Sequence, residues 1–378
     1  MKVLIACGGT GGHINPGLAI ADIIKTAYPD AEFLFAGTPD HMEAKLVPQA
    51  GYRFEAIKVA GFQRKLSLEN IGRNIKAVSY LVTSGSRAKQ IISGFKPDIA
   101  IGTGGYAAGP VIRMAAKMGI PTAIHEQNAY PGVTNKLLSK EVDYVMLTVK
   151  EALDFMDASK FEYSVTGLPV RSNINTMTKK EAREKLGFND DFTVLSFGGS
   201  LGAGCINETM TEAIKWHTGK NLKINHIHGY GGMGKDTFPQ AMKAAGIPLK
   251  SDRLRITEYI NDMDVCLAAA DLVICRSGAS TLAELEAAGK ASILIPSPIV
   301  AGNHQYHNAM VLGKANAAVV IEQKDASATR IISEIDKLYQ SPEKAEKMSE
   351  NAASLHLADT NERILEVIKK LAGKGKAK

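Results

Sequence analysis

The stretch KVLIACGGTGGHINPGLAIADIIK, residues 2–25, decides the fold of the first half of this chain. Its apolar start predicts a buried strand over Val3–Ala6, followed by a tight turn over Gly8–Gly12. A helix is predicted over Leu18–Ile24, entered through Pro16. Glycines let the backbone come close to an anion, and the unpaired N–H groups at a helix N-terminus favour negative charge. The stretch therefore predicts a phosphate-binding loop between a strand and a helix.

His13 follows these glycines directly, where the positive end of the helix dipole favours the neutral imidazole. Two interpretations are open: a general base, or an ordinary polar residue in the first helical turn. A dinucleotide site is disfavoured because the glycines read GGTGGH and not GxGxxG. The next predicted strand, Glu32–Ala36, also ends in Gly37 and Thr38 and not in the acidic residue that holds a ribose.

The composition is that of a folded protein: 378 residues, of which 45% are hydrophobic and 22% are charged. This length suits about two ordinary domains. The four cysteines have no CxxC spacing, which predicts reduced thiols in a cytoplasmic protein. Because nothing approaches the ~20 consecutive apolar residues of a membrane span, the sequence predicts a protein that is soluble or peripheral to a membrane.

The net charge of +6 is concentrated in a basic apolar segment, residues 61–96. The segment is rich in lysine and arginine, and its apolar residues recur at roughly helical spacing. Such a segment suits an anionic membrane surface, although an ordinary surface helix with its apolar face in the core explains the same pattern. Nucleic acid is disfavoured as a partner because no DNA- or RNA-binding motif accompanies the charge.

The pattern of strand, glycine loop and helix recurs at residues 96–119 and again at residues 191–214. Between them, residues 121–128 predict a strand that ends in the polar residues HEQN, at the edge where open parallel sheets bind ligands. GLPVR, residues 167–171, reads as a linker. The duplication predicts two Rossmann-like α/β domains, residues 1–167 and 168–354.

A further block, residues 270–298, places a strand over Leu272–Cys275 before RSGAST and a helix. Arg276 and the N–H groups at this helix start would suit a diphosphate, and Glu284 could accept two ribose hydroxyls. A capping-box start with a solvated Glu284 is the alternative. Two other motifs are interpreted as decoys: HGYGGMGKD, residues 228–236, as a surface loop, and DMD, residues 262–264, as helix capping and not a metal site.

Taken in order, GGTGGHINPGLAIA, GTGGYAAGP, HEQN, GLPVR, GGSLGA, RSGAST with Glu284, and HQYHNA resemble the MurG family over nearly the whole chain. These bacterial enzymes use UDP-N-acetylglucosamine (UDP-GlcNAc) to make lipid II for peptidoglycan. The resemblance implies a GT-B fold, with two Rossmann-like domains whose parallel sheets face each other across a cleft, and no metal or other cofactor. It also implies inverting transfer of GlcNAc to the C4 hydroxyl of MurNAc-pentapeptide on undecaprenyl diphosphate (lipid I), at the cytoplasmic face of the membrane.

Site residues follow from the same resemblance. The implied UDP-GlcNAc contacts are Thr10, Gly11, Gly12, Asn128, Arg171, Ser200, Ile260, Ala279, Ser280, Thr281, Leu282, Ala283, Glu284 and Gln305. The acceptor diphosphate would lie on Gly104, Gly105 and Tyr106, and the candidate bases are His13 and Glu126. The uracil is expected near Ile260, the ribose on Glu284, and the leaving group on Arg171 and the helix start after Arg276.

Two departures affect the expected donor geometry: Leu168 replaces the Asn of GNPVR, and Leu201 replaces the Gln of GGSQGA. The C-terminal segment, residues 355–378, is expected to pack back on the first domain, as in other GT-B proteins. The alternatives are a UDP-GlcNAc 2-epimerase of the same fold and a nucleotide-sugar-binding module without catalysis. An epimerase would need neither a lipid acceptor nor a membrane patch.

Overall fold

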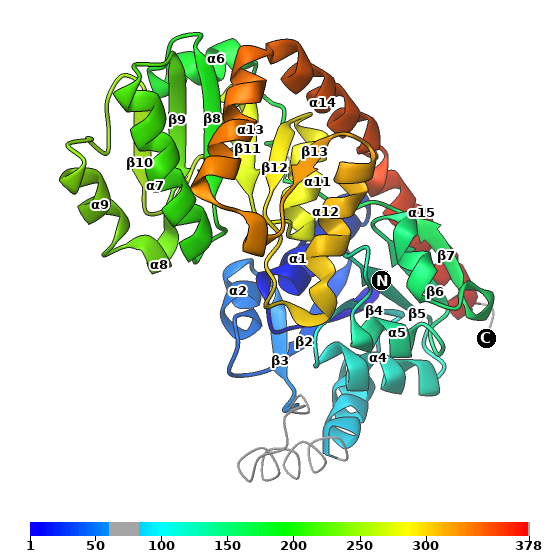
Figure 1. Cartoon of the computed structure of the whole chain (residues 1–378). Coiled ribbons are helices and arrows are strands. Elements are labelled where there is room, and N and C mark those ends of the chain that lie inside the picture. The colour runs from blue at the N-terminus through cyan, green and yellow to red at the C-terminus, as the bar shows by residue number, and fades with distance from the viewer. Residues whose placement is uncertain (60–82, 172, 377–378) are drawn as a thin grey trace. The chain divides into compact units, whose positions relative to one another are not determined.

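The computed structural model describes residues 1–59, 83–171 and 173–376 (Figure 1). The chain divides into two compact units. Unit 1 comprises Met1–Pro169 and Asp359–Lys378, and unit 2 comprises Val170–Ala358. Most of the basic apolar segment, residues 61–82, lies outside the described residues.

Unit 1 is built on a seven-stranded sheet in the order β3-β2-β1-β4-β5-β6-β7, in which all pairs are parallel. Its strands are β1 (Lys2–Cys7), β2 (Glu32–Gly37), β3 (Arg53–Ala56), β4 (Ile99–Gly104), β5 (Thr122–Glu126), β6 (Tyr144–Leu147) and β7 (Glu162–Val165). The order of the strands reverses between β1 and β4, the place where open α/β sheets bind ligands.

Helices cover both faces of this sheet because successive side chains of β1 point to opposite faces. Val3 and Ile5 pack with α1 (Gly11–Ala27) and α15 (Thr360–Lys376), whereas Leu4 packs with residues 83–95 and α4 (Ala108–Lys117). The remaining short helices are α2 (Glu43–Gln49), α5 (Val133–Leu138), η1 (Lys150–Phe155) and η2 (Ala158–Lys160). Both faces of the sheet are therefore buried, as the apolar run of β1 predicts.

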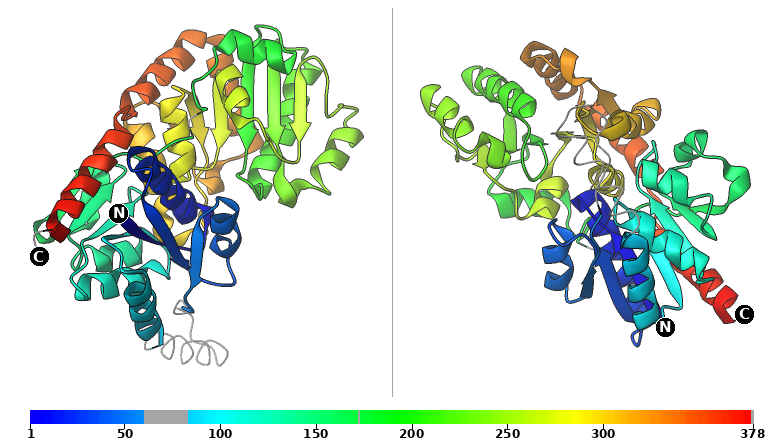
Figure 2. Two further views of the ribbon diagram at one scale, coloured as in Figure 1. Left: turned by 180° about the vertical axis from the view of Figure 1, so that it is seen from behind. Right: turned by 90° about the horizontal axis from the view of Figure 1, so that it is seen from below.

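The C-terminal helix α15 is part of unit 1 (Figure 2). It lies against α1, and its Ile364, Ile368 and Leu371 side chains are fully buried in the same core. Its Lys370 Nζ pairs with Glu162 Oε2 on β7 at 2.5 Å. The apolar stripe of this helix, which repeats every three or four residues, explains why the chain returns to the first sheet.

Unit 2 repeats the architecture with six parallel strands in the order β10-β9-β8-β11-β12-β13. Its strands are β8 (Phe192–Phe197), β9 (Ile224–Gly229), β10 (Leu254–Thr257), β11 (Leu272–Cys275), β12 (Ala291–Leu294) and β13 (Ala318–Val320). Its helices are α6 (Lys179–Leu186), α7 (Gly204–Gly219), α8 (Gly231–Gly234), α9 (Phe238–Ala244), α10 (Met263–Ala269), α11 (Ala279–Ala287), η3 (Ala301–Asn303), α12 (His304–Lys314), η4 (Gln323–Asp325), α13 (Ala328–Gln340) and α14 (Pro342–Leu355). The prediction of two Rossmann-like domains with parallel sheets is confirmed.

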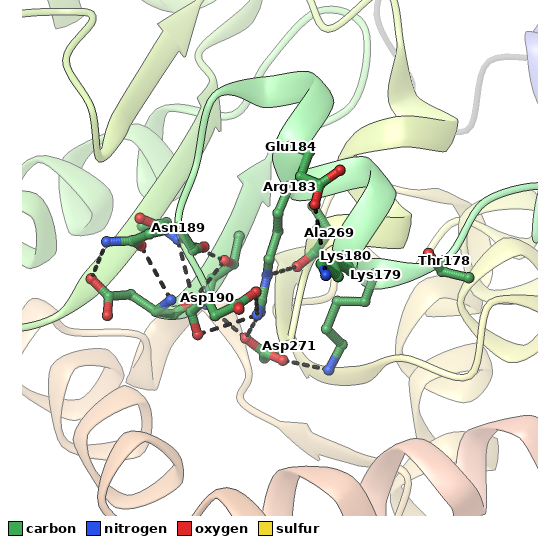
Figure 3. A network of polar contacts seen from close by, with 12 residues as sticks. Thr178, Lys179, Lys180, Arg183, Glu184, Asn189, Asp190, Ala269 and Asp271 are labelled. Carbon is green, nitrogen blue, oxygen red and sulfur yellow. Dashed lines mark hydrogen bonds and ion pairs between the residues drawn. The ribbon is translucent and has the colours of Figure 1, made fainter.

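An ion-pair network fixes the amino ends of β8 and β11 (Figure 3). The Asp271 carboxylate pairs with Arg183 on α6 at 2.5 Å, with Lys179 at 2.6 Å, and accepts the N–H of Thr193 at 2.8 Å. Arg183 also donates to the Ala269 carbonyl at 3.2 Å. These bonds join α6 to the amino ends of the two central strands. The glycine loops follow the opposite, carboxyl ends of the same strands.

Two of the predicted decoys differ in detail from expectation. Residues 228–236 are not a surface loop: they continue β9 and form α8, with His228 fully buried. Asp262 precedes α10, but its carboxylate forms a two-pronged ion pair with Arg255 at 2.7 and 2.8 Å in place of a helix cap. Sequence position placed this aspartate at a helix start, but an arginine on the adjacent strand competes for its oxygens more strongly than backbone N–H groups.

Candidate functional site

The first glycine loop joins β1 to α1 at the point where the strand order of unit 1 reverses. Gly9 has a φ of +88°, a conformation that residues with a side chain rarely adopt. Thr10 and Gly12 are exposed, and Gly11 is partly exposed. The N–H groups at the start of α1 therefore lie at an accessible edge, as an anion site requires.

A buried acid that the sequence analysis missed supports this loop. Glu43, on α2, is fully buried and accepts the N–H of Gly9 at 3.0 Å. It also accepts both the N–H and the hydroxyl of Thr38, at 2.9 and 2.5 Å. Since Glu43 is 34 residues from Gly9 in the chain, no local pattern could have revealed this contact.

The second glycine loop, after β4, lies directly against the first. Gly104 and Gly105 have φ values of +105° and +83°. A Cβ atom at Gly105 would lie 2.2 Å from the Gly8 carbonyl oxygen, so only glycine fits there. Tyr106 follows with a side chain that is 64% exposed. The structure thus brings together the two loops that the sequence placed at residues 8–12 and 102–105.

His13 occupies the first turn of α1 and is partly exposed. Its Nδ1 atom lies 3.2 Å from Oε1 of Gln127, which follows β5. The hydroxyl of Thr103 donates to the His13 carbonyl at 2.7 Å. The Gln127 contact therefore holds the ring, and the Thr103 contact holds the backbone of His13, at the carboxyl edge of the sheet.

Glu126, the other candidate base, is 1% exposed and accepts four hydrogen bonds. One oxygen accepts the N–H of Asn128 at 2.9 Å and its side-chain amide at 3.1 Å. The other accepts the N–H of Gly132 at 3.0 Å and the side-chain amide of Asn135 at 2.8 Å. Both carboxylate oxygens therefore organise the loop that carries Asn128, a predicted donor contact.

In unit 2 the strand order reverses between β8 and β11, and a loop followed by a helix leaves each strand there. After β8, Ser200 is exposed and Leu201, one of the two departures from the family motif, is 74% exposed. After β11, Gly278 leads into α11, whose start exposes part of Ala279, Ser280 and Thr281. The start of α11 lies at the position where doubly wound sheets hold phosphates.

Arg171 and Glu284 are 113 residues apart in the chain, yet they form an ion pair. Arg171 Nε lies 2.7 Å from Glu284 Oε1, with side chains that are 49% and 18% exposed. The sequence analysis expected Arg171 to contact the leaving diphosphate and Glu284 to contact the ribose. The structure brings both side chains to one place in unit 2.

Other predicted donor contacts are less accessible through their side chains. Leu282, Ala283 and Ile260 are 4%, 6% and 6% exposed, and the Leu282 N–H is bonded to the Gly278 carbonyl. Gln305 Oε1, at the start of α12, accepts the N–H of Ser297 at 2.9 Å. Among the predicted donor contacts on α11, the side chains of Ala279, Ser280, Thr281 and Glu284 are thus the more accessible ones.

Arg276, expected to offer a cation to a diphosphate, instead binds inside unit 2. Its guanidinium donates to the carbonyls of Ile295 and Pro296 at 2.9 and 3.1 Å, and to Gln323 Oε1 at 2.6 Å. Three acceptors near the ends of β12 and β13 therefore hold this guanidinium. Leu168, the second departure, is 4% exposed.

The predicted residues fall into two groups, one in each unit. Unit 1 gathers those of the loops after β1, β4 and β5: Thr10, Gly11, Gly12, His13, Gly104, Gly105, Tyr106, Glu126 and Asn128. Unit 2 gathers those around β8, β10, β11 and β12: Arg171, Ser200, Ile260, Ala279, Ser280, Thr281, Leu282, Ala283, Glu284 and Gln305.

Comparison with known proteins identifies both units. Residues 3–147 match the glycosyltransferase family 28 N-terminal domain, and residues 193–364 match the glycosyltransferase family 28 C-terminal domain. The crystal structure of MurG from Acinetobacter baumannii superposes with a TM-score of 0.78 at 26% identity, covering 98% of this chain and 99% of that one. A structure titled as a putative UDP-N-acetylglucosamine 2-epimerase from Listeria monocytogenes gives 0.68 at 14% identity, covering 98% and 96% of the two chains, a likeness of fold alone.

Sequence similarity to a curated relative is stronger still. The UDP-N-acetylglucosamine–N-acetylmuramyl-(pentapeptide) pyrophosphoryl-undecaprenol N-acetylglucosamine transferase of Acetivibrio thermocellus is 47% identical over 371 residues, 98% of each chain. Together with the two domain matches and the structural neighbours, this confirms the expected GT-B fold. The chain belongs to the MurG family of the family 28 glycosyltransferases.

Proposed function

We propose that this protein is an inverting glycosyltransferase that moves GlcNAc from UDP-GlcNAc to the C4 hydroxyl of MurNAc-pentapeptide on undecaprenyl diphosphate. The product is lipid II, the disaccharide precursor of peptidoglycan. The observation that carries the proposal is the 47% identity, over 98% of both chains, to an enzyme whose name states this donor and this acceptor.

Inversion at the anomeric carbon requires a single in-line displacement. The acceptor oxygen forms the new glycosidic bond while the bond to UDP breaks, and the hydroxyl proton leaves to a base. The departing UDP carries the negative charge, which positive groups and N–H donors stabilise. The protein must therefore supply one base and one anion-stabilising site.

His13 is the proposed base. Its Nδ1 atom is engaged by Gln127, which leaves Nε2 as the atom for the acceptor hydroxyl. Glu126 is assigned the organisation of the Asn128 loop, because its oxygens already accept four N–H groups. A carboxylate that took up the acceptor proton would have to give up some of these bonds.

Unit 2 is proposed to bind the donor. The start of α11 suits the diphosphate, Glu284 the ribose and the region of Ile260 the uracil, with Arg171 beside Glu284 to stabilise the leaving UDP. For Thr10, Gly11, Gly12 and Asn128 of unit 1 we keep the role of UDP-GlcNAc contacts that the family resemblance implies.

The acceptor side is proposed to lie on unit 1. Gly104, Gly105 and the exposed Tyr106 would meet the lipid diphosphate. Within the described residues every helix is too short or too polar to cross a membrane. We assign the basic apolar segment, residues 61–96, to docking on an anionic surface at the cytoplasmic face, although only its end from residue 83 onward falls within the described chain.

The first test is transfer of radiolabelled GlcNAc from UDP-GlcNAc to a short-chain lipid I analogue, with EDTA present. Label should enter the lipid product only when the acceptor is added. Label that remains in the nucleotide sugar but converts to UDP-ManNAc would identify an epimerase, and unchanged UDP-GlcNAc would identify a binding module; either result overturns the proposal.

A pair of variants then separates the two candidate bases. His13→Ala should lower kcat by about 100-fold or more while the Kd for UDP-GlcNAc changes little. Glu126→Ala, which leaves four donors without their acceptor, should lower the Tm by about 5 to 10 °C. Near-normal turnover in His13→Ala would move the role of base to Glu126.

A further inference from the structure

We propose that Gln127 and His125 are positioning residues that hold the His13 ring in the tautomer with its proton on Nδ1 and its lone pair on Nε2. The inference rests on the proposed function, in which Nε2 accepts the proton of the acceptor hydroxyl. It starts from a chain of hydrogen bonds inside unit 1 that runs from the Gly167 carbonyl to the His13 ring.

The first link sets the tautomer of His125, a fully buried residue of β5. Its Nε2 atom lies 3.0 Å from the Gly167 carbonyl oxygen. Because a carbonyl can only accept, Nε2 carries the proton and Nδ1 carries the lone pair. The Thr166 hydroxyl also donates to this carbonyl, at 3.2 Å. Burial lowers the pKa of His125 to about 4, so the ring keeps a single proton at neutral pH.

The second link sets the orientation of the Gln127 amide, which is 3% exposed. Its Nε2 atom lies 2.9 Å from the His125 carbonyl oxygen and 3.2 Å from His125 Nδ1. Both partners are acceptors, so both N–H groups of the amide are used there. If the amide were flipped, its oxygen would face two buried acceptors, and two hydrogen bonds would be lost.

The third link transmits this orientation to His13. With its nitrogen committed to His125, Gln127 presents Oε1 to His13 Nδ1 at 3.2 Å. An amide oxygen can only accept, so His13 Nδ1 carries the proton. The ring is confined at the same time, because a Cβ atom at Gly104 would lie only 2.7 Å from His13 Nδ1.

The consequence is a defined base. A neutral imidazole has one lone pair, and the other nitrogen can only donate. If the proton were on Nε2, that atom would present an N–H to the acceptor hydroxyl and could not take its proton. The chain from Gly167 through His125 and Gln127 excludes this unproductive form before substrate binds.

The direct test is nitrogen NMR of the full-length protein with its nine histidines labelled with ¹⁵N. His13→Gln identifies the His13 signals, and their chemical shifts distinguish a protonated nitrogen from one with a lone pair. The wild type should show a proton on Nδ1. In Gln127→Met, which keeps the size of the side chain but removes both polar ends, this preference should be lost.

Kinetics with graded variants give the second readout. Gln127→Met should lower kcat by about 10- to 100-fold, with the KM for UDP-GlcNAc nearly unchanged. His125→Leu should lower kcat by as much. His125→Asn should keep most of the wild-type kcat, because its amide oxygen can replace Nδ1 as an acceptor. The double variant of Gln127→Met and His125→Leu should be no slower than either single change, because both act through one chain.

The outcomes separate this inference from the proposed function. A wild-type His13 with its proton on Nε2, or a Gln127→Met protein with an unchanged His13 tautomer, overturns the inference. If His125→Asn and His125→Leu lower kcat equally, the role assigned to His125 is overturned. This test does not depend on whether Gln127→Met folds. If the tautomer behaves as expected while His13→Ala turns over normally, the chain of hydrogen bonds stands and the role of His13 as base falls.

Discussion

Acidification from about pH 7.5 to about pH 5 should destabilise unit 2, because its core holds three histidines in the neutral form. His217 on α7 and His226 and His228 on β9 are 3%, 1% and 0% exposed. Ser196 Oγ lies 2.9 Å from His226 Nε2 and 2.8 Å from His228 Nδ1, and His217 Nε2 lies 3.1 Å from His226 Nδ1. Protonation of any of these rings would bury a positive charge, and this chain of contacts contains no carboxylate to balance it.

The magnitude follows from the pKa values. Burial lowers the pKa of His217 to about 4 and that of His228 to about 3, and holds the pKa of His226 well below its usual value. Unfolding returns each to about 6.5, so the unfolded chain binds more protons below that pH. The contribution of these histidines to the free energy of unfolding is fully present above about pH 6.5 and is lost as the pH falls toward about 4. At pH 5, His217 and His228 each cost about 2 kcal/mol, about 4 kcal/mol together, and His226 adds to the same side.

A loss of this size is measurable against the 5 to 15 kcal/mol of a typical protein. Trp216 is the chain's only tryptophan, and its ring centroid lies 6.5 Å from that of His217. Urea unfolding followed by its fluorescence therefore reports on this part of unit 2. Down to about pH 5 the ordinary carboxylates stay ionised, so the change in the free energy of unfolding between pH 7.5 and 5 belongs mainly to histidines.

His217→Gln tests the assignment. A glutamine amide can either donate to or accept from His226 but does not titrate, so the pH-dependent loss should shrink by about 2 kcal/mol. His41→Gln, which removes an exposed histidine, should leave it unchanged. The reasoning is refuted if the wild type has equal free energies of unfolding at both pH values, or if His217→Gln retains the full dependence.

Two further predictions concern the glycine loops and the ion pair. Glu284→Ala removes the carboxylate proposed for the ribose and leaves Arg171 without its partner, so the Kd for UDP should rise by about 10-fold or more in calorimetry, and an unchanged Kd would exclude the ribose role. Gly105→Ala should lower the Tm and the activity, since its Cβ would lie 2.2 Å from the Gly8 carbonyl oxygen at a positive φ. Gly94→Ala, in a helical stretch with open space around the added atom, is the matched control and should leave the Tm unchanged or raise it; equal behaviour of the two variants would contradict the packing of the loops.

The sequence by itself determined the repeating units and their order. Strands, glycine loops and helices depend on neighbouring residues, so periodicity and the glycines of residues 8–12 and 102–105 were enough to predict two parallel-sheet domains. Because the carboxyl ends of parallel strands share one edge, the same patterns also placed His13, Glu126 and Glu284 at ligand-binding edges. The linear order of the motifs carried the family, which the comparisons confirm.

Only the tertiary structure decided which partner each side chain binds. His13 meets Gln127 across 114 residues, and Arg171 meets Glu284 across 113. Arg276 was expected at the phosphate edge, yet carbonyls at the end of β12 bind its guanidinium. Such contacts depend on strand order, on rotamers and on which acceptors the packing leaves nearby, none of which a local pattern encodes. The sequence could place His13 at the edge of the sheet, but the contact of its Nδ1 atom with Gln127 is a property of the folded neighbourhood.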